Sequence, residues 1–129
     1  MSNTGDYSRR FTDEESIETL LRTLADGGCR RILRSLQQAS MSAPELVECC
    51  EIGRSTVYRK LDLLEQAGFV STRIRLNEPG RHTTEYDLNL QALRVEHNPN
   101  GIELVVRYYD EDSQASKQRS LPRSGSSSS

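Results

Sequence analysis

Residues 51–70 read EIGRSTVYRKLDLLEQAGFV, and this stretch decides which fold the chain can adopt. Val57, Leu61 and Leu64 recur at the spacing of one helical face, which indicates an amphipathic helix with a buried apolar stripe. Gly68 follows the stripe and suits the left-handed residue that commonly ends a helix. The stretch therefore predicts one helix that stops abruptly before a change of structure.

The other side of this helix carries an unusual set of polar side chains. With Val57 facing inward and about 100° per residue, Ser55, Tyr58 and Arg59 fall on the opposite side. Hydroxyl groups, a phenol and a guanidinium can hydrogen-bond to base edges when a helix lies in the major groove of DNA. The N–H groups of the first turn can meet a phosphate. This side of the helix is therefore expected to face DNA.

Three shorter amphipathic helices are predicted before it. Thr12 and Ser42 each stand three residues before a glutamate, which is the capping-box pattern that begins a helix. Residues 26–28, Asp-Gly-Gly, separate the first two helices, and residues 51–53 form a tight turn between the third and the fourth. The expected inner faces are Ile17, Leu20, Leu21 and Leu24; Cys29, Ile32, Leu33 and Leu36; and Ala43, Leu46, Val47 and Cys50.

After the fourth helix the apolar period changes from 3.6 to 2, which is typical of β-strands. Residues 70–76 and 84–88 flank a turn at residues 77–80 and predict a hairpin. Its first strand has one cationic side with Arg73 and Arg75, and one apolar side made of Val70, Thr72, Ile74 and Leu76. A second hairpin is expected farther on, because Asn100-Gly101 is a strong turn signal between residues 93–96 and 102–108.

The block from about Ile17 to Leu88 resembles a winged helix-turn-helix domain, most closely that of ArsR-like and related archaeal transcriptional regulators. Three segments carry the resemblance: APELV at residues 43–47, IGRSTVYRKL at residues 52–61, and LEQAGFV at residues 64–70. It implies an α+β fold of three to four short helices and a β-hairpin wing. The C-terminal β-ribbon extension stands where ArsR proteins usually have a helix.

This resemblance and the composition suggest an organisation in four parts. Residues 1–11 are polar and are expected to be a flexible N-terminus, and residues 12–90 form the winged helix-turn-helix DNA-binding domain. Residues 91–112 form the β-ribbon, a candidate for dimerisation. Residues 113–129 have almost no apolar content and are expected to be a disordered tail.

The candidate DNA contacts lie on the fourth helix and on the wing. Arg59 is expected to contact a guanine through both guanidinium N–H groups, whereas Arg54 and Lys60 grip phosphates and fix the register. Basic side chains of the wing would approach phosphates or the adjacent minor groove. The full candidate set is Arg54, Ser55, Thr56, Tyr58, Arg59, Lys60, Arg73, Arg75, Arg81 and His82.

Charge is distributed in a way that favours DNA over a merely solvated surface. The whole chain of 129 residues carries a formal charge of −2, but residues 54–82 hold six cations against three anions. A winged helix that binds a protein is the alternative within the same fold. It would be favoured by an acidic or apolar outer side, which the fourth helix lacks.

The three cysteines do not suggest a disulfide framework, and two of them are adjacent. Cys49-Cys50 stands where metal-sensing ArsR relatives have a Cys-x-Cys pair, but neighbouring helical residues point about 100° apart. No metal or other cofactor is therefore expected, and a thiol- or metal-responsive sensor repressor remains an alternative. His82 and His97 lie near turns without partners at catalytic spacing. No phosphate-binding glycine loop, nucleophile elbow or zinc-protease motif occurs, so an enzyme is not expected.

The function predicted from the sequence is that of a double-stranded DNA-binding transcriptional regulator that acts by occupying promoter sites. One short recognition helix reads few base pairs, so a homodimer on a near-palindromic site is expected. In similar regulators the first helix and the C-terminal extension supply the dimer contact, which here points to residues 17–24 and 102–109. The transcription machinery is a further possible partner. No apolar run reaches the length of a membrane span, and a cytoplasmic location is expected.

Overall fold

The computed structural model describes residues 7–78 and 80–109 of the chain. The predicted tail and the first six residues lie outside this part. The elements in chain order are β1 (Tyr7–Phe11), α1 (Glu14–Ala25), α2 (Gly27–Gln38), β2 (Met41–Ser42), α3 (Ala43–Cys50), α4 (Arg54–Gln66), β3 (Val70–Glu78), β4 (Arg81–Leu88), β5 (Leu90–Asn98) and β6 (Gly101–Tyr108).

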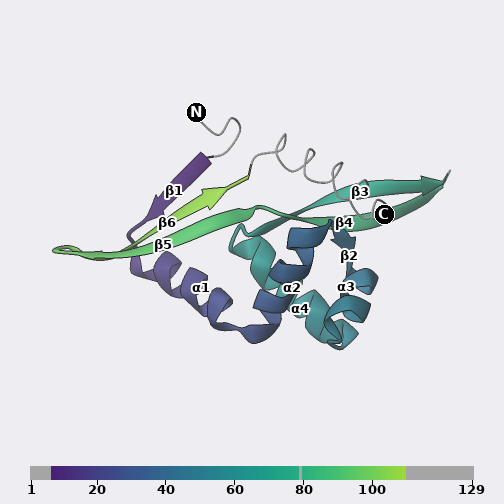
Figure 1. Cartoon of the computed structure of the whole chain (residues 1–129), viewed down its shortest axis with the longest axis horizontal. Coiled ribbons are helices and arrows are strands. Elements are labelled where there is room, and N and C mark those ends of the chain that lie inside the picture. The colour runs from purple at the N-terminus through teal and green to yellow at the C-terminus, as the bar shows by residue number, and fades with distance from the viewer. Residues whose placement is uncertain (1–6, 79, 110–129) are drawn as a thin grey trace.

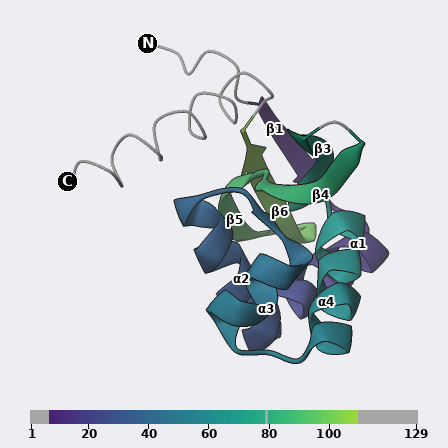
Figure 2. The same cartoon turned by 90° about the vertical axis from the view of Figure 1, so that its right-hand side faces the viewer.

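Two three-stranded antiparallel sheets accompany the four helices. One sheet has the order β2-β4-β3 and contains the wing, which is the β3-β4 hairpin; the other has the order β1-β6-β5. Figure 1 shows the two hairpins running to opposite ends of the molecule along one side of the helices. Figure 2, seen from the end that carries the wing, shows the four helices grouped beneath the strands. The predicted α+β class and winged helix-turn-helix arrangement are confirmed.

The first helix begins one residue later than predicted. Asp13, not Thr12, is the N-cap, and its carboxylate accepts a hydrogen bond of 2.8 Å from the backbone N–H of Ser16. Either residue has a suitable oxygen, and the carboxylate also benefits from the positive end of the helix dipole. Leu21, expected on the inner face of α1, is exposed, while Thr23 is buried and donates its hydroxyl to a carbonyl one turn earlier.

The helix-turn-helix unit consists of α3, a short turn and α4. The capping box at the start of α3 is confirmed: Ser42 N–H donates to Glu45 Oε1 over 2.8 Å, and Glu45 N–H donates to Ser42 Oγ over 3.3 Å. Glu51 ends α3 in the left-handed conformation with φ 56°, which turns the chain sharply. Gly53 is then the N-cap of α4. This turn sets the angle at which α4 leaves the body.

The end of α4 is the predicted Schellman motif. Gly68 has φ 80°, a backbone conformation that is strained for residues with a Cβ. Its N–H donates to Glu65 O over 2.9 Å. The N–H of Phe69 donates to Leu64 O over 2.9 Å, and the Phe69 ring is completely buried. The chain therefore enters the wing from a fixed point at the end of α4.

The β-ribbon formed by β5 and β6 shares the core of the helices. Leu104, Val106 and Tyr108 lie in the segment 102–109 that was expected above to supply a dimer contact, and they are buried in the same cluster as the inner faces of the four helices. These three side chains alternate along β6, and their face is covered by the chain's own helices. An apolar face recognised in a sequence does not indicate whether it is buried by the same chain or by a second copy.

Tyr7–Phe11 form strand β1, which corrects the prediction of a flexible segment over residues 1–11. The strand pairs with β6, and the Tyr7 ring stacks on Tyr108 with 5.1 Å between ring centroids. Arg10 forms an ion pair with Glu103 on the same sheet. The partner strand lies about a hundred residues later in the chain, so local sequence patterns could not reveal the pairing.

Candidate nucleic-acid interface

The burial predicted for α4 is confirmed on both sides. Val57, Leu61 and Leu64 are buried, whereas Ser55, Tyr58, Arg59 and Asp62 are exposed. These four exposed residues form what is called here the outer face of α4. The helix thus presents hydroxyl, phenol, guanidinium and carboxylate groups from a rigid support.

The N-terminus of α4 is also open to an acceptor. Gly53 has no side chain, and no side-chain cap hydrogen bond is present at this helix end within the described residues. The Arg54 side chain is exposed in the first turn, and Thr56 is half-buried. Free N–H groups at a helix start attract anions such as phosphate, and an adjacent guanidinium adds to that attraction.

Lys60 is placed differently from the predicted phosphate contact. Its ammonium nitrogen lies 2.9 Å from Asp26 Oδ2, and its side chain is only 13% exposed. The hydrogen bond from Lys60, followed by the one from the Cys29 N–H, lowers the pKa of Asp26 to about 2. A Cβ on Gly28 would come within 2.6 Å of Lys60 Cε, so the lysine stem occupies the space that this glycine leaves. Lys60 thus forms an internal ion pair between α4 and α2, and this pair competes with the predicted phosphate contact.

The two wing arginines also have internal partners. Arg75 donates from Nη1 to Glu85 Oε2 over 2.6 Å, and its Nη2 lies 3.7 Å from Glu45 Oε2 on α3. Arg73 Nε lies 3.5 Å from Glu85 Oε1 and 3.5 Å from Asp87 Oδ2. The two β4 carboxylates are 5% and 6% exposed as residues, so each needs a cationic partner to offset its loss of hydration.

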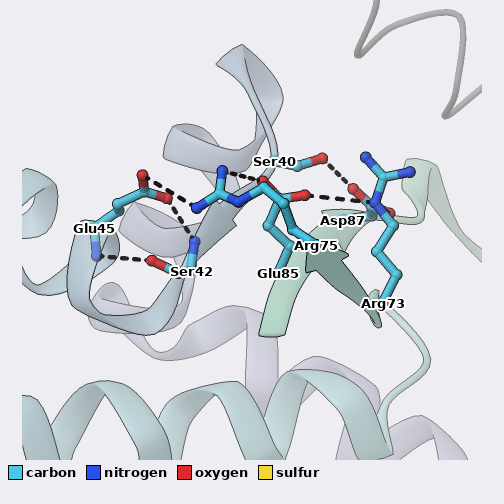
Figure 3. Close-up of polar contacts among 7 residues, drawn as sticks. All are labelled: Ser40, Ser42, Glu45, Arg73, Arg75, Glu85 and Asp87. Carbon is cyan, nitrogen blue, oxygen red and sulfur yellow. Dashed lines mark hydrogen bonds and ion pairs between the residues drawn. The ribbon is translucent and has the colours of Figure 1, made fainter. Parts of the chain in front are cut away.

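These contacts form one network, drawn in Figure 3, that joins the wing to the start of α3. Ser40 donates its hydroxyl to Asp87, and Glu45 belongs at once to this network and to the capping box with Ser42. The wing network consists of Ser40, Ser42, Glu45, Arg73, Arg75, Glu85 and Asp87. Together with the pairing of β2 with β4, in which Ser42 lies opposite Glu85, it joins the wing to the helix-turn-helix unit.

The apolar side of β3 is buried only at its root. Val70 and its cross-strand partner Leu88 belong to the core, but Ile74 is 57% exposed and Leu76 is 71% exposed. The two faces predicted for this strand are present, with environments that the alternation alone did not indicate. The side of β3 that carries the arginines contacts carboxylates of β4 and α3. The side that carries Ile74 and Leu76 faces solvent.

Tyr86 locates this aliphatic side relative to α4. Burial raises the pKa of the Tyr86 phenol, and the Glu65 carboxylate, Tyr58 and Asp62 of α4 raise it further. The phenol therefore lies near the outer face of α4. Directly opposed residues of an antiparallel pair point to the same side, and Tyr86 opposes Thr72. Thr72 therefore shares the side of the wing on which Tyr86 lies, and Ile74 and Leu76 follow on that side farther along β3.

His82 lies on this same side of the wing, opposite Leu76, and is exposed. Arg81 begins β4 at the tip, where its backbone pairs with Glu78 across a small irregularity in register. His82 therefore shares the side of Ile74 and Leu76, whereas Arg73 and Arg75 lie on the other side of the wing.

The cysteines lie apart from this surface. Cys29 is completely buried, and its burial, followed by the nearby Asp26 carboxylate, raises the pKa of its thiol to about 11. Cys50 is buried and Cys49 is exposed, with their sulfur atoms 3.4 Å and 3.5 Å from Ser35 Oγ. Over residues 7–78 and 80–109, no group of three or more His, Cys, Asp or Glu side chains is arranged to hold a metal ion.

Comparison with known protein families supports a helix-turn-helix interpretation of this surface. Residues 24–73 match the family model of a helix-turn-helix domain, a span that includes α2, α3 and α4. The match and the fold together support a helix-turn-helix regulator with a DNA-binding domain. No curated protein matches the chain. None of the described helices is long and apolar enough to cross a membrane.

Proposed function

We propose that this chain is a sequence-specific double-stranded DNA-binding transcriptional regulator that acts by occupying promoter sites. The observation that carries the proposal is the outer face of α4, which combines exposed Ser55, Tyr58 and Arg59 with a firmly buried stripe. A helix held in this way can enter the major groove without rearrangement of the body. The match to a helix-turn-helix domain supports the same role.

The proposed DNA contacts come from α4 and from the tip of the wing, and three further cations have positioning roles. Arg59 reads guanine, Ser55, Thr56 and Tyr58 contact bases or phosphates, and Arg54 binds a phosphate at the helix start. On the wing, Arg81 and His82 approach the duplex. Lys60, Arg73 and Arg75 take positioning roles, because their charges are already paired inside the molecule.

The regulator is proposed to act as a homodimer in the cytoplasm, like the ArsR-like and archaeal proteins that the sequence resembles. Because the inner face of β6 is covered, the dimer contact has to use other apolar side chains of α1 and the ribbon. Leu21 on α1 and Val95 and Ile102 on the ribbon are exposed and are candidates. A two-fold dimer would place two copies of α4 on neighbouring half-sites.

Selection from a pool of random duplexes tests the proposal. The full chain should enrich a short common sequence, and the selected duplex should compete strongly against unrelated DNA of the same length. An Arg59→Asp variant should lose this preference while it unfolds at the temperature of the wild type. Failure to retain any duplex at low ionic strength would contradict the proposed function.

A further inference from the structure

Strand β5 forms an open edge of the sheet β1-β6-β5. Among the described residues it pairs only with β6, and none of its side chains is buried. Figure 1 shows the hairpin of β5 and β6 projecting beyond α1, so the helices do not cover this edge near the tip. An uncovered edge presents unpaired backbone N–H and C=O groups, which can pair with another strand.

The turn at the tip of this hairpin fixes which backbone groups point outward. Asn98 lies opposite Gly101, so the turn has two residues, and a turn of this length is closed by a hydrogen-bonded pair. Hydrogen-bonded and non-hydrogen-bonded pairs alternate along an antiparallel ladder, and the register is regular from the turn back to residue 92. The N–H and C=O groups of Leu93, Val95 and His97 therefore point to the open edge.

The charges of β5 are arranged symmetrically about Val95. Arg94 and Glu96 flank it on the other face of the sheet, where Arg94 Nε donates to Glu96 Oε2 over 2.8 Å within the chain. An antiparallel copy of β5 with its Val95 opposite Val95 would set Arg94 of each chain opposite Glu96 of the other. These are non-hydrogen-bonded pairs, whose side chains approach most closely. A copy shifted by two residues would set arginine opposite arginine or glutamate opposite glutamate, so charge selects one register.

The same register covers an exposed apolar side chain. Val95 is 50% exposed, and its cross-strand neighbour on β6 is Leu104, which is completely buried. In the paired sheet, Val95 of the second copy becomes the other neighbour of Val95. The apolar row then continues from the core of one chain to the core of the other.

The charges of the other long edge strands oppose pairing with a second copy. β1, at the other edge of the same sheet, has Arg9 and Arg10 near its centre, and β3, at the edge of the wing sheet, has Arg73 and Arg75. An antiparallel copy would bring these cations close together, and like charges on opposed positions destabilise a strand pair. Self-complementary charge thus distinguishes β5 from both.

We propose that two copies of this chain pair through β5, antiparallel about a two-fold axis at Val95, and join their sheets into one. This pairing rests on the homodimer proposed above and specifies its contact, but it does not require DNA. The axis is perpendicular to the sheet, so the helices of both copies lie on the same face of it. α4 takes no part in the contact, and its outer face stays available in both copies.

The experiment measures the oligomeric state of the full chain without DNA, by sedimentation equilibrium over a range of concentrations. Arg94→Glu and Glu96→Arg are the test variants, because each sets like charges opposite each other across the axis. Arg94→Ala is the matched control, since it removes exposed ion pairs and adds no repulsion. Thermal unfolding of each variant checks that the fold is unchanged.

Wild type and Arg94→Ala should dimerise with similar dissociation constants, whereas each charge reversal should weaken dimerisation about tenfold or more. A chain that carries both reversals should dimerise like the wild type. An equimolar mixture of the two single variants should form a heterodimer, because their charges are then complementary. Val95→Pro should prevent dimerisation without unfolding the chain, since the N–H that it removes points away from β6.

Three results would overturn the β5 contact: a wild-type chain that stays monomeric, charge reversals that dimerise as well as the wild type, or a mixture without heterodimer. None of them bears on DNA binding by α4, which the selection of duplexes measures separately. A dimeric chain that retains no duplex would remove the proposed function and leave the β5 contact in place.

Discussion

The ammonium of Lys60 lies 2.9 Å from Asp26 Oδ2, so the helix proposed to read DNA is anchored to the first turn of α2. Asp26 is also the N-cap of α2, where it accepts a hydrogen bond of 2.8 Å from the Cys29 N–H. One carboxylate thus begins one helix and positions another. Asp13 caps α1 with the same 2.8 Å geometry and has no ion pair to a second helix among the described contacts, which makes it a natural comparison.

Asp26→Ala should lower the free energy of unfolding by about 2 kcal/mol. Loss of an N-cap typically costs about 1 kcal/mol. The remainder is the cost of leaving the partly buried Lys60 ammonium without its carboxylate partner. This cost is reduced because Asp26 is partly exposed to solvent. Urea denaturation of wild type and variant measures the difference. Asp13→Ala should produce a smaller loss, and equal losses in the two variants would show that the ion pair with Lys60 contributes nothing.

Acid should remove the contribution of Asp26 within a defined range of pH. The pKa of Asp26 is about 2 in the folded chain and about 3.9 in an unfolded one, so the unfolded state binds the proton more tightly. The stabilisation is fully present above about pH 4 and is lost as the pH falls through 2. The stability difference between wild type and Asp26→Asn should narrow over this interval. Denaturation curves at several pH values measure it, and a constant difference would contradict the assignment.

Arg75→Ala should destabilise the chain by about 2 kcal/mol, because it leaves the buried Glu85 carboxylate without its closest cation. The wing then loses its link to Glu45, so DNA affinity should fall as well. The salt dependence of binding should not change, since the guanidinium is engaged inside the molecule. Arg94→Ala removes an exposed ion pair with Glu96 on β5 and should change little. A flatter salt dependence in Arg75→Ala would return this arginine to the DNA contact.

Arg59→Ala should cost about 1–3 kcal/mol of binding to the selected duplex and should relax the preference at one base position. The fold should tolerate the change, because Arg59 is exposed on the outer face of α4. Binding measured against a set of single-base variants of the duplex tests this role. Equal weakening on every duplex would indicate a phosphate contact instead.

Features encoded in a few neighbouring residues could be predicted from the sequence. The buried stripe of α4, the capping box at Ser42 and the Schellman end at Gly68 each depend on residues within one or two turns. The hairpin between β5 and β6 is equally local and it forms, with Asn98 opposite Gly101, so that Pro99 and Asn100 make the turn. These features, together with the resemblance to winged helix-turn-helix regulators, predicted the arrangement.

Features that depend on distant partners could not be predicted in the same way. The pairing of Lys60 with Asp26 and the addition of β1 to β6 join segments with no local signal for each other. The register of the wing is a further example. Symmetric pairing across the expected turn at residues 77–80 would set Arg73 opposite Thr84, whereas in the structure a register shift between Leu76 and Glu78 accompanies the pairing of Arg73 with Glu85. The cross-strand ion pairs that neutralise this side of the wing depend on that one-residue difference.

The burial of Leu104, Val106 and Tyr108 beneath the helices has a consequence for how this chain could be divided. A fragment that stops after the wing would keep every residue proposed to touch DNA. It would lack β6, however, and would expose apolar side chains of α1 that β6 covers. Such a fragment is expected to aggregate rather than fold. The ribbon and the helices thus share one core, and we expect them to fold only as a single unit.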